Sequence, residues 1–208
     1  RTLVGSTQRG RLSAYVRSEF IAQSALPFIF LSLQSIAMAD VYIALIHHPV
    51  YDKEHKVVTT SITNIDIHDI ARSALTYGVK RYFVVNPVRT LHALAEKILN
   101  HWQYGHGSVY NKTRKDALAI VALTYTLDGV LEFIVQETHE QPRVIATSAR
   151  GGDNRVTFSA VRSSIEQNGR PVLLLFGTGW GLTEEVFSQA EAILEPIQGT
   201  GAYNHLSV

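Results

Sequence analysis

The chain of 208 residues has no cysteine and a single methionine, Met38. The absence of cysteine excludes disulfide bonds, thiolate zinc sites and cysteine nucleophiles, and it is weakly in favour of a cytoplasmic location. Charged residues make up 18% of the chain and hydrophobic residues 46%, which is typical of a globular protein. The formal net charge is only +1, so a basic surface, if present, must be a local patch.

The chain also lacks the motifs that define several enzyme classes. No lysine follows Gly181 or Gly201 as a Walker A motif requires, and the segment GTGWGL lacks the third glycine of a dinucleotide-binding fingerprint. Ser207 does not lie in the GxSxG context of a serine hydrolase. His47 and His48 are adjacent, but no third ligand follows at a fitting spacing, so no metal site is predicted.

The first 37 residues are interpreted as an N-terminal extension or linker. The chain begins at Arg1 and its only methionine is Met38, which favours a fragment or a processed chain. Basic residues precede an apolar stretch at 20–33, an order that also fits a targeting signal. Polar residues and Pro27 interrupt that stretch, so it is too short and too broken to cross a bilayer, and no membrane partner is predicted.

From residue 41 onward, short apolar runs alternate with amphipathic stretches. Strands are predicted at 41–46, 81–86, 117–124, 143–148, 172–176 and 192–197. Helices are predicted from a cap at Thr63 or Asn64 to Gly78, at 91–102, 127–135 and 158–167, and after Thr183. Residues 104–115 are predicted as a loop rich in aromatic and basic side chains. The alternation predicts an α/β fold with a mostly parallel sheet covered by helices on both faces.

The segment PVLLLFGTGWGL, residues 171–182, carries the clearest indication of a site. A buried strand at 172–176 is followed by three glycines, Gly177, Gly179 and Gly181, and then by the start of a helix. Glycine permits positive φ and lets a ligand approach the backbone closely. A strand, a glycine turn and a helix together form a binding edge at the carboxyl end of a sheet, although a tight turn without a ligand remains open.

Three loops that follow predicted strands, 86–88, 177–182 and 198–207, would meet at one rim if their strands are neighbours. Polar candidates for chemistry or RNA contact are Asn64, Asp66, His68, Asp69, Arg72, Asn204, His205 and Ser207. For His68 and Asp69 a solvated first turn of the helix is favoured. For Arg72 a surface ion pair with Asp69 or His68 is an equally open interpretation.

Three segments in order resemble the motifs of the SPOUT (SpoU–TrmD) class of RNA methyltransferases. They are ITNIDIHDIARSALTYGVKRYFVVNP, PVLLLFGTGWGL and LEPIQGTGAYNHLSV, at 62–87, 171–182 and 194–208. Within that class the chain resembles the bacterial SAM-dependent RNA methyltransferase family, which occurs alone or fused to the tRNA (guanine-N1)-methyltransferase TrmD. The resemblance covers about residues 39–208, and it predicts one methyltransferase domain at 38–208.

The resemblance implies a C-terminal trefoil knot, a homodimer, S-adenosylmethionine as cofactor and tRNA or rRNA as substrate. By similarity the catalytic residues are Arg72, Asn64 and Asn204. The cofactor-binding residues implied are Asn86, Pro87, Gly177, Thr178, Gly179, Trp180, Gly181, Leu182, Ile197, Gln198, Asn204, His205 and Leu206. Because a further helix follows this point in the family, the domain is expected to be truncated at its C-terminus.

One departure from the resemblance leaves more than one function open. SpoU enzymes carry a glutamate in the second motif, whereas GTGWGL contains no acid. The first hypothesis is an active RNA methyltransferase in which Arg72 orients the RNA nucleophile or a phosphate. The second is a catalytically silent cofactor- or RNA-binding module that is fused to, or partners, another RNA-modifying domain, and a third is a nucleotide-binding α/β enzyme of another class. Residues 104–115 are either an RNA surface or an ordinary exposed loop.

Overall fold

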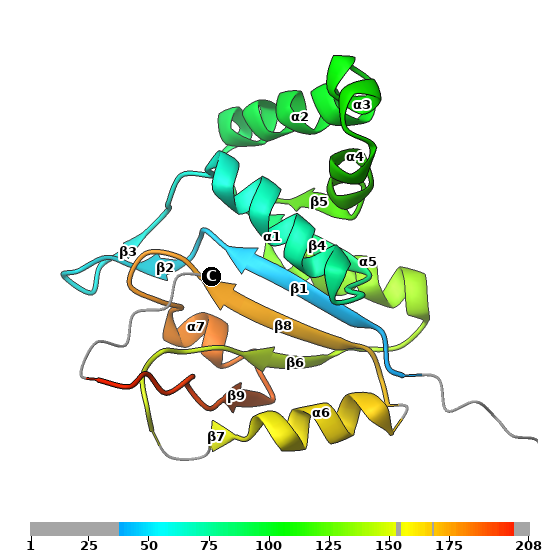
Figure 1. Cartoon of the computed structure of the whole chain (residues 1–208). Helices are drawn as coiled ribbons and strands as arrows, with labels where there is room; N and C mark the ends of the chain where they lie inside the picture. Colours follow the sequence, from blue (N-terminus) through cyan, green and yellow to red (C-terminus); the bar gives the residue numbers. More distant parts are fainter. Residues whose placement is uncertain (1–37, 153–154, 168, 202–208) are drawn as a thin grey trace, which may run out of the picture. The chain divides into compact units, whose positions relative to one another are not determined.

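The structure is a computed structural model, and it describes residues 38–152, 155–167 and 169–201. These residues form a seven-stranded sheet in the order β5-β4-β1-β8-β6-β9-β7 (Figure 1). Its strands are β1 (Val41–Ile46), β4 (Arg81–Val85), β5 (Val121–Thr124), β6 (Arg143–Ala146), β7 (Arg155–Val156), β8 (Val172–Gly177) and β9 (Ala192–Leu194). All pairings in this sheet are parallel. A separate antiparallel hairpin joins β2 (Val50–Tyr51) to β3 (Val57–Val58).

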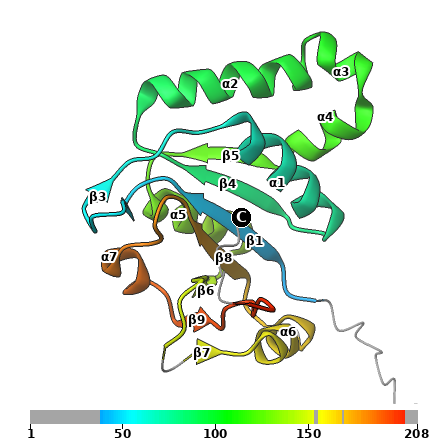
Figure 2. The same cartoon turned by 60° about the vertical axis from the view of Figure 1, so that its left-hand side comes forward.

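Helices cover both faces of this sheet (Figures 1 and 2). They are α1 (Asn64–Thr76), α2 (Arg89–Gln103), α3 (His106–Tyr110), α4 (Lys112–Leu118), α5 (Leu127–Thr138), α6 (Phe158–Glu166) and α7 (Glu184–Phe187). Buried side chains of α1, α2 and α4 pack on one face, and those of α5 and α7 pack on the other. The predicted α/β fold with a mostly parallel sheet is therefore confirmed.

The central strand β1 explains why its sequence is an unbroken apolar run. Tyr42, Ala44 and Ile46 belong to the core under α5 and α7, whereas Ile43 and Leu45 belong to the core under α1 and α2. Successive side chains of a strand point to opposite faces, so a strand covered on both sides needs apolar residues at every position. The same argument holds for β4 and β8, which flank β1.

Helix α1 begins and ends where its sequence predicts. Thr63 is the N-cap: its hydroxyl accepts a hydrogen bond from the Asp66 amide at 3.2 Å, and the Asp66 carboxylate accepts one from the Thr63 amide at 2.8 Å. Such a capping box contributes on the order of 1 kcal/mol to helix stability. The helix ends before Gly78, whose φ of +75° favours glycine.

The prediction of a loop at 104–115 is wrong, because most of this segment forms the helices α3 and α4. The glycines at 105 and 107 suggested a loop, but Gly107 is small enough for α3 to pack on Trp102, where a Cβ would lie 2.6 Å from a ring carbon. Asn111 caps α4 by accepting from the Arg114 amide at 3.0 Å. Tertiary packing thus outweighs the weak local helix propensity.

Other differences concern the limits of elements. The apolar run at 117–124 was predicted as one strand, yet its first residues end α4 and only Val121–Thr124 forms β5. The short edge strand β7 had no signal in the sequence. The predicted knot is not tested, because the helix expected to thread it follows Val208 in the family. Residues 202–208 lie outside the described residues, as do residues 1–37. In the described part of the chain, no helix is both long enough and apolar enough to span a membrane.

Candidate functional site

The carboxyl ends of β4, β1 and β8 lie next to one another at one edge of the sheet (Figure 1). Ile46 at the end of β1 pairs with Val85 of β4 on one side and with Gly177 of β8 on the other. The loops 86–88 and 177–182 therefore flank β1, about 10 Å apart, since neighbouring strands are about 4.8 Å apart. We call this edge the rim.

The sequence predicts that the three loops meet at one rim if their strands are immediate neighbours. The loops do leave the sheet at the same edge, but the three strands are not immediate neighbours. Strand β1 separates β4 from β8, and β6 separates β8 from β9. All of these strands are parallel, so the loops after them still leave the sheet at the same edge. Of the third loop, Ile197 and Gln198 are described and exposed, whereas Asn204, His205 and Leu206 lie outside the described residues.

The glycine turn after β8 is packed against the β2–β3 hairpin. The amide of Trp180 donates to the carbonyl of Tyr51 at 2.8 Å, and the Tyr51 amide donates to the carbonyl of Gly181 at 2.9 Å. Gly179 has a φ of +60°, and a Cβ there would lie 2.8 Å from the Tyr51 carbonyl oxygen. At Gly179, the close approach that we expected of a ligand is thus made by the protein's own backbone. Gly181, with a φ of +110°, has open space where a Cβ would lie.

One buried side chain, His47, and two half-buried ones, Thr60 and Thr178, connect β1, the hairpin and the glycine turn at the centre of the rim. His47 Nδ1 lies 2.8 Å from Thr60 Oγ1, and Thr60 Oγ1 lies 2.6 Å from Thr178 Oγ1. The Thr178 hydroxyl donates to the Ile46 carbonyl at 3.0 Å. We call these three residues the His47–Thr60–Thr178 relay.

The direction of each hydrogen bond in the relay follows from counting protons. A hydroxyl has one proton, and that of Thr178 is used on the Ile46 carbonyl. In the arrangement in which Thr178 donates to the Ile46 carbonyl, Thr60 donates to Thr178 and His47 donates from Nδ1 to Thr60. In the neutral imidazole this leaves Nε2 of His47 as an acceptor, and this buried atom has no hydrogen-bond partner among the described residues.

Burial sets the charge state of His47. Its side chain is 1% exposed, and Nε2 lies 3.8 Å from the Asp66 carboxylate. Burial lowers the pKa of His47 below its ordinary value of 6.5, and the nearby Asp66 charge offsets only part of that effect. His47 is therefore neutral at pH 7, and the Asp66 carboxylate remains engaged by the Thr63 amide.

The lowered pKa of His47 makes folding stability depend on pH. Below pH 6.5 the unfolded chain takes up a proton that buried His47 resists, so the free energy of unfolding should fall as pH falls. One such group contributes a slope of up to about 1.4 kcal/mol per pH unit to the free energy of unfolding.

Urea titrations between pH 7.5 and 5.5 should show a shallower decline of this free energy in His47→Asn, whose amide can still donate to Thr60. If the free energy of unfolding of the variant declined with pH as steeply as that of the wild type, a neutral, buried His47 would be contradicted. The pKa of His68 is also lowered by burial, so some decline should remain in the variant.

Asn86, a predicted cofactor residue, is fully buried at the end of β4. Its Nδ2 donates to the Thr60 carbonyl at 3.0 Å, and its Oδ1 accepts from the Val88 amide at 2.9 Å. Its backbone carbonyl lies 2.6 Å from Nε2 of His92, whose ring stacks on that of Tyr125 at a centroid distance of 4.1 Å. Asn86 therefore fixes the path of the loop that begins with Pro87.

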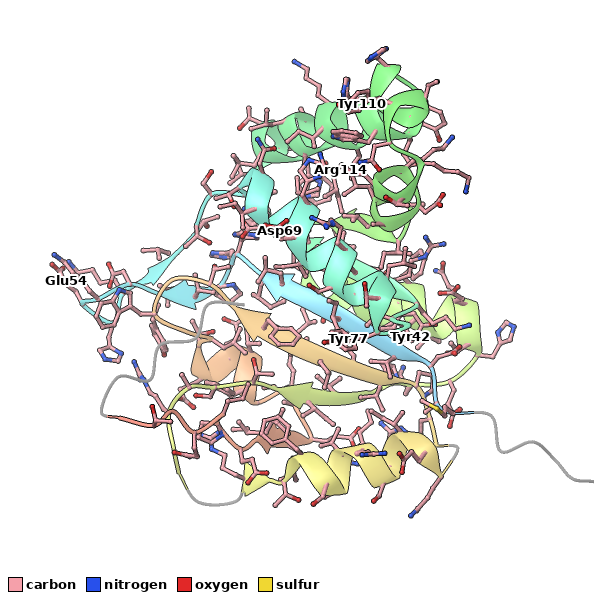
Figure 3. All side chains as sticks on the ribbon, in the orientation of Figure 1. Tyr42, Glu54, Asp69, Tyr77, Tyr110 and Arg114 are labelled. Carbon is pink, nitrogen blue, oxygen red and sulfur yellow. The ribbon has the colours of Figure 1, made fainter. Side chains whose placement is uncertain are left out.

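Two of the predicted catalytic residues lie on α1. Asn64 is exposed at its first position, at the rim end of the helix. Arg72 lies about 12 Å further along the axis, since an α-helix rises 1.5 Å per residue. It is exposed and forms an ion pair with Asp69 at 3.8 Å, one of the two partners considered from the sequence. A shallow depression on this face is lined by Asp69, Arg72, Ser73, Thr76 and Tyr77. Asp69 and Tyr77 are labelled in Figure 3.

The sequence-based interpretation of His68 as a solvated residue is wrong, whereas that of Asp69 is confirmed. His68 packs edge-on against Trp102 at 5.6 Å, and its buried Nδ1 has no hydrogen-bond partner among the described residues. Asp69 is exposed. The structure also adds His47, Thr60 and His92 to the rim. Of these three residues, the sequence singled out His47 alone, because it directly follows a strand. It was then considered as a metal ligand and not as part of a hydrogen-bonded group.

The architecture by itself defines a class of protein. A parallel α/β sheet with a glycine turn at the carboxyl end of a central strand is typical of enzymes that bind a nucleotide-like cofactor at that edge. No group of three or more metal-ligating side chains occurs within residues 38–152, 155–167 and 169–201. The chain belongs to the SAM-dependent RNA methyltransferase family, whose sequence profile matches residues 40–208.

Individual relatives agree with this family. An uncharacterized protein of Aquifex aeolicus is 40% identical over 169 residues, which is 81% of this chain and 82% of the relative. A tRNA (guanine-N(1)-)-methyltransferase of Oleidesulfovibrio alaskensis is 42% identical over 169 residues, which is 81% of this chain but only 39% of the relative. This chain thus spans about two fifths of that enzyme's length.

A solved structure supports the fold. A probable methylase family protein from Haemophilus influenzae aligns with a TM-score of 0.52 and 16% identity over 81% of this chain and 59% of that protein. At that identity the likeness concerns the fold alone. The family predicted from the sequence, its enzyme class and its cofactor S-adenosylmethionine are confirmed at the level of the family.

The residues at the rim fit such a cofactor. Trp180 and Ile197 are 55% and 58% exposed, so the loops after β8 and β9 present apolar side chains to solvent. The buried hydroxyl oxygens of Thr124, at the end of β5, and of Thr183, after β8, have no partner among the described residues. Cofactor sites typically combine apolar walls with a few polar groups that fix orientation.

Proposed function

We propose that this domain, with its boundary at residue 38, binds S-adenosylmethionine at the rim and transfers the methyl group to tRNA or rRNA. The observation that carries the proposal is the family match over residues 40–208 together with the glycine turn and Asn86 on either side of β1. The named relative that acts on tRNA is consistent with an RNA substrate.

The cofactor supplies a methyl group that its sulfonium already makes electrophilic. The work of the protein is therefore to hold the donor and the RNA nucleophile in line and to exclude water. Asn86, Pro87 and the turn Gly177–Leu182 would hold the donor, with Ile197, Gln198, Asn204, His205 and Leu206 on the third side. The relay keeps the turn fixed to β1 and to the hairpin.

Arg72 and Asn64 would act on the RNA. Both are exposed on α1, so a phosphate or a base of a large substrate can contact their side chains at the protein surface. The distance along α1 between Arg72 and the rim end of the helix favours an orienting role for Arg72. The third predicted catalytic residue, Asn204, belongs to the same proposal.

A homodimer, a cytoplasmic location and a C-terminal knot complete the proposal. A fused or separate tRNA (guanine-N1)-methyltransferase partner is a further part of it, which the greater length of the named relative supports. Light scattering of the protein, alone and mixed with such an enzyme, tests the two assembly predictions.

A catalytically silent module is the second candidate, because the glycine turn carries no acid. Arg72→Ala separates the two. In an enzyme, the rate of methyl transfer should fall on the order of 10²-fold, which is the effect of removing one positioned hydrogen-bond donor. Its affinity for S-adenosylhomocysteine should be unchanged. A module has no turnover to lose.

The direct test is transfer of labelled methyl from S-adenosylmethionine to total tRNA and total rRNA from the source organism. We expect incorporation into one of the two pools, and loss of it when the RNA is digested beforehand. Calorimetry with S-adenosylhomocysteine, NAD and ATP serves as the control for cofactor identity. Binding of S-adenosylhomocysteine without transfer to either pool would support the silent module.

A further inference from the structure

The segment from Tyr104 to Lys115 is a well-packed projection rather than a loop. Trp102 at its base contacts three elements: His68 of α1 at 5.6 Å, Arg114 of α4 at 4.8 Å and Gly107 of α3, which packs directly on the indole ring. Asn111 caps α4, and Gln103 donates to the Lys115 carbonyl at 2.9 Å. The outward side chains of this segment are therefore presented on a defined scaffold.

Those outward side chains include unusually exposed large residues. Tyr104, Val109 and Tyr110 are 86%, 87% and 78% exposed. The ring of His106 lies 6.2 Å from that of Tyr110, with 27° between the ring planes. Figure 3 shows Tyr110 beside α3, farther from the strands than Arg114, which lies closer to α1. Together with Lys112 and Lys115, these residues form what we call the α3–α4 surface.

The local charge indicates what kind of partner fits. Between residues 101 and 119 there are three cationic residues, Lys112, Arg114 and Lys115, and one acid, Asp116, which gives a net charge of +2. The whole chain of 208 residues carries only +1. Exposed aromatic rings interleaved with cations suit a polyanion that has unpaired bases, because bases stack on the rings while phosphates meet the cations.

We propose that the α3–α4 surface binds an unpaired stretch of the RNA substrate, with bases stacked on Tyr104 and Tyr110 and phosphates paired with Lys112 and Lys115. This proposal rests on the proposed function and adds a second contact area outside the rim. Duplex RNA would not use the rings in this way, because its bases are already stacked on one another. A loop or an end of a folded RNA meets the requirement.

The experiment measures binding of total tRNA, total rRNA and polyuridylate to the wild-type protein and to two double variants across a salt series. Tyr104→Ala with Tyr110→Ala should weaken binding about 30-fold or more without changing the salt dependence. Lys112→Gln with Lys115→Gln should lower the slope of log affinity against log salt by about 0.7 for each phosphate that the variant no longer neutralises. Tyr104→Phe with Tyr110→Phe keeps both rings and should bind as the wild type does.

Lys80→Gln serves as the charge control, since Lys80 lies before β4, at the opposite edge of the sheet from the rim. Thermal unfolding and S-adenosylhomocysteine affinity should be unchanged in all of these variants. If the wild type binds RNA and the double alanine variant binds it equally well, the surface proposal is wrong while the proposed function stands. If the wild type binds none of the RNAs, both fail. If the alanine variant instead dissociates a dimer in light scattering, the surface is an interface between copies.

Discussion

Replacing Gly179 by alanine is expected to disrupt the rim more than any other single change in the glycine turn. Gly179 has a φ of +60°, where an L side chain costs about 1–2 kcal/mol. Its Cβ would also lie 2.8 Å from the Tyr51 carbonyl oxygen, which is backbone and cannot rotate away. Overpacking of this kind adds about 1–3 kcal/mol. The hairpin and the turn would have to separate, with loss of the hydrogen bond between Trp180 and Tyr51.

The expected result for Gly179→Ala is a fall of about 2–5 kcal/mol in the free energy of unfolding. We also expect affinity for S-adenosylhomocysteine to weaken on the order of 100-fold, measured by calorimetry at a temperature where the variant is folded. Gly151→Ala is the matched control, because Gly151 has open space around its Cβ position and an exposed backbone. Near-wild-type cofactor affinity in Gly179→Ala would show that the turn does not contact the donor.

The second large effect is expected for Asn86→Ala. Its amide group makes two hydrogen bonds inside the protein, to the Thr60 carbonyl and from the Val88 amide. Truncation removes both hydrogen bonds, whose partners lie on half-buried Thr60 and exposed Val88, and each such bond contributes about 0.5–1.5 kcal/mol. The free energy of unfolding should fall by about 1–3 kcal/mol in urea titrations, and cofactor affinity should fall because the loop at Pro87 loses its support.

Asn100→Ala is the control for this experiment, since Asn100 is exposed on α2 and far from the end of β4 in sequence. Its stability should stay within about 0.5 kcal/mol of the wild type. Asn86→Asp separates the two hydrogen bonds, because a carboxylate can still accept from the Val88 amide but cannot donate to Thr60. If Asn86→Ala were as stable as Asn100→Ala, the hydrogen bonds of the buried amide would not support the rim.

The order of strands and helices could be predicted from the sequence because apolar periodicity and caps are local signals. The run at 41–46, the Thr63–Asp66 capping box and Gly78 each identify one element without reference to the rest of the chain. Helices α3 and α4 could not be predicted in this way. They depend on Trp102, whose ring meets α1, α3 and α4 only after the chain has folded.

The candidate site was predictable to a similar extent. Asn86 and the turn 177–182 were identified because they directly follow strands, and the structure brings both to the rim. The relay was not predictable, because Thr60 and Thr178 are 118 positions apart and no sequence motif indicates that their side chains contact each other. The contact of Gly179 with the hairpin was also not predictable, because it joins segments that are far apart in the sequence.

Hydrogen–deuterium exchange with and without S-adenosylmethionine tests most directly whether the rim holds the methyl donor. The account predicts slower exchange on binding at 86–91 and 177–182. It predicts little change in β7, the last strand in the sheet order, and in helix α6 that follows it. Saturating cofactor that leaves both rim loops unprotected, or that protects only β7 and α6, would contradict the account.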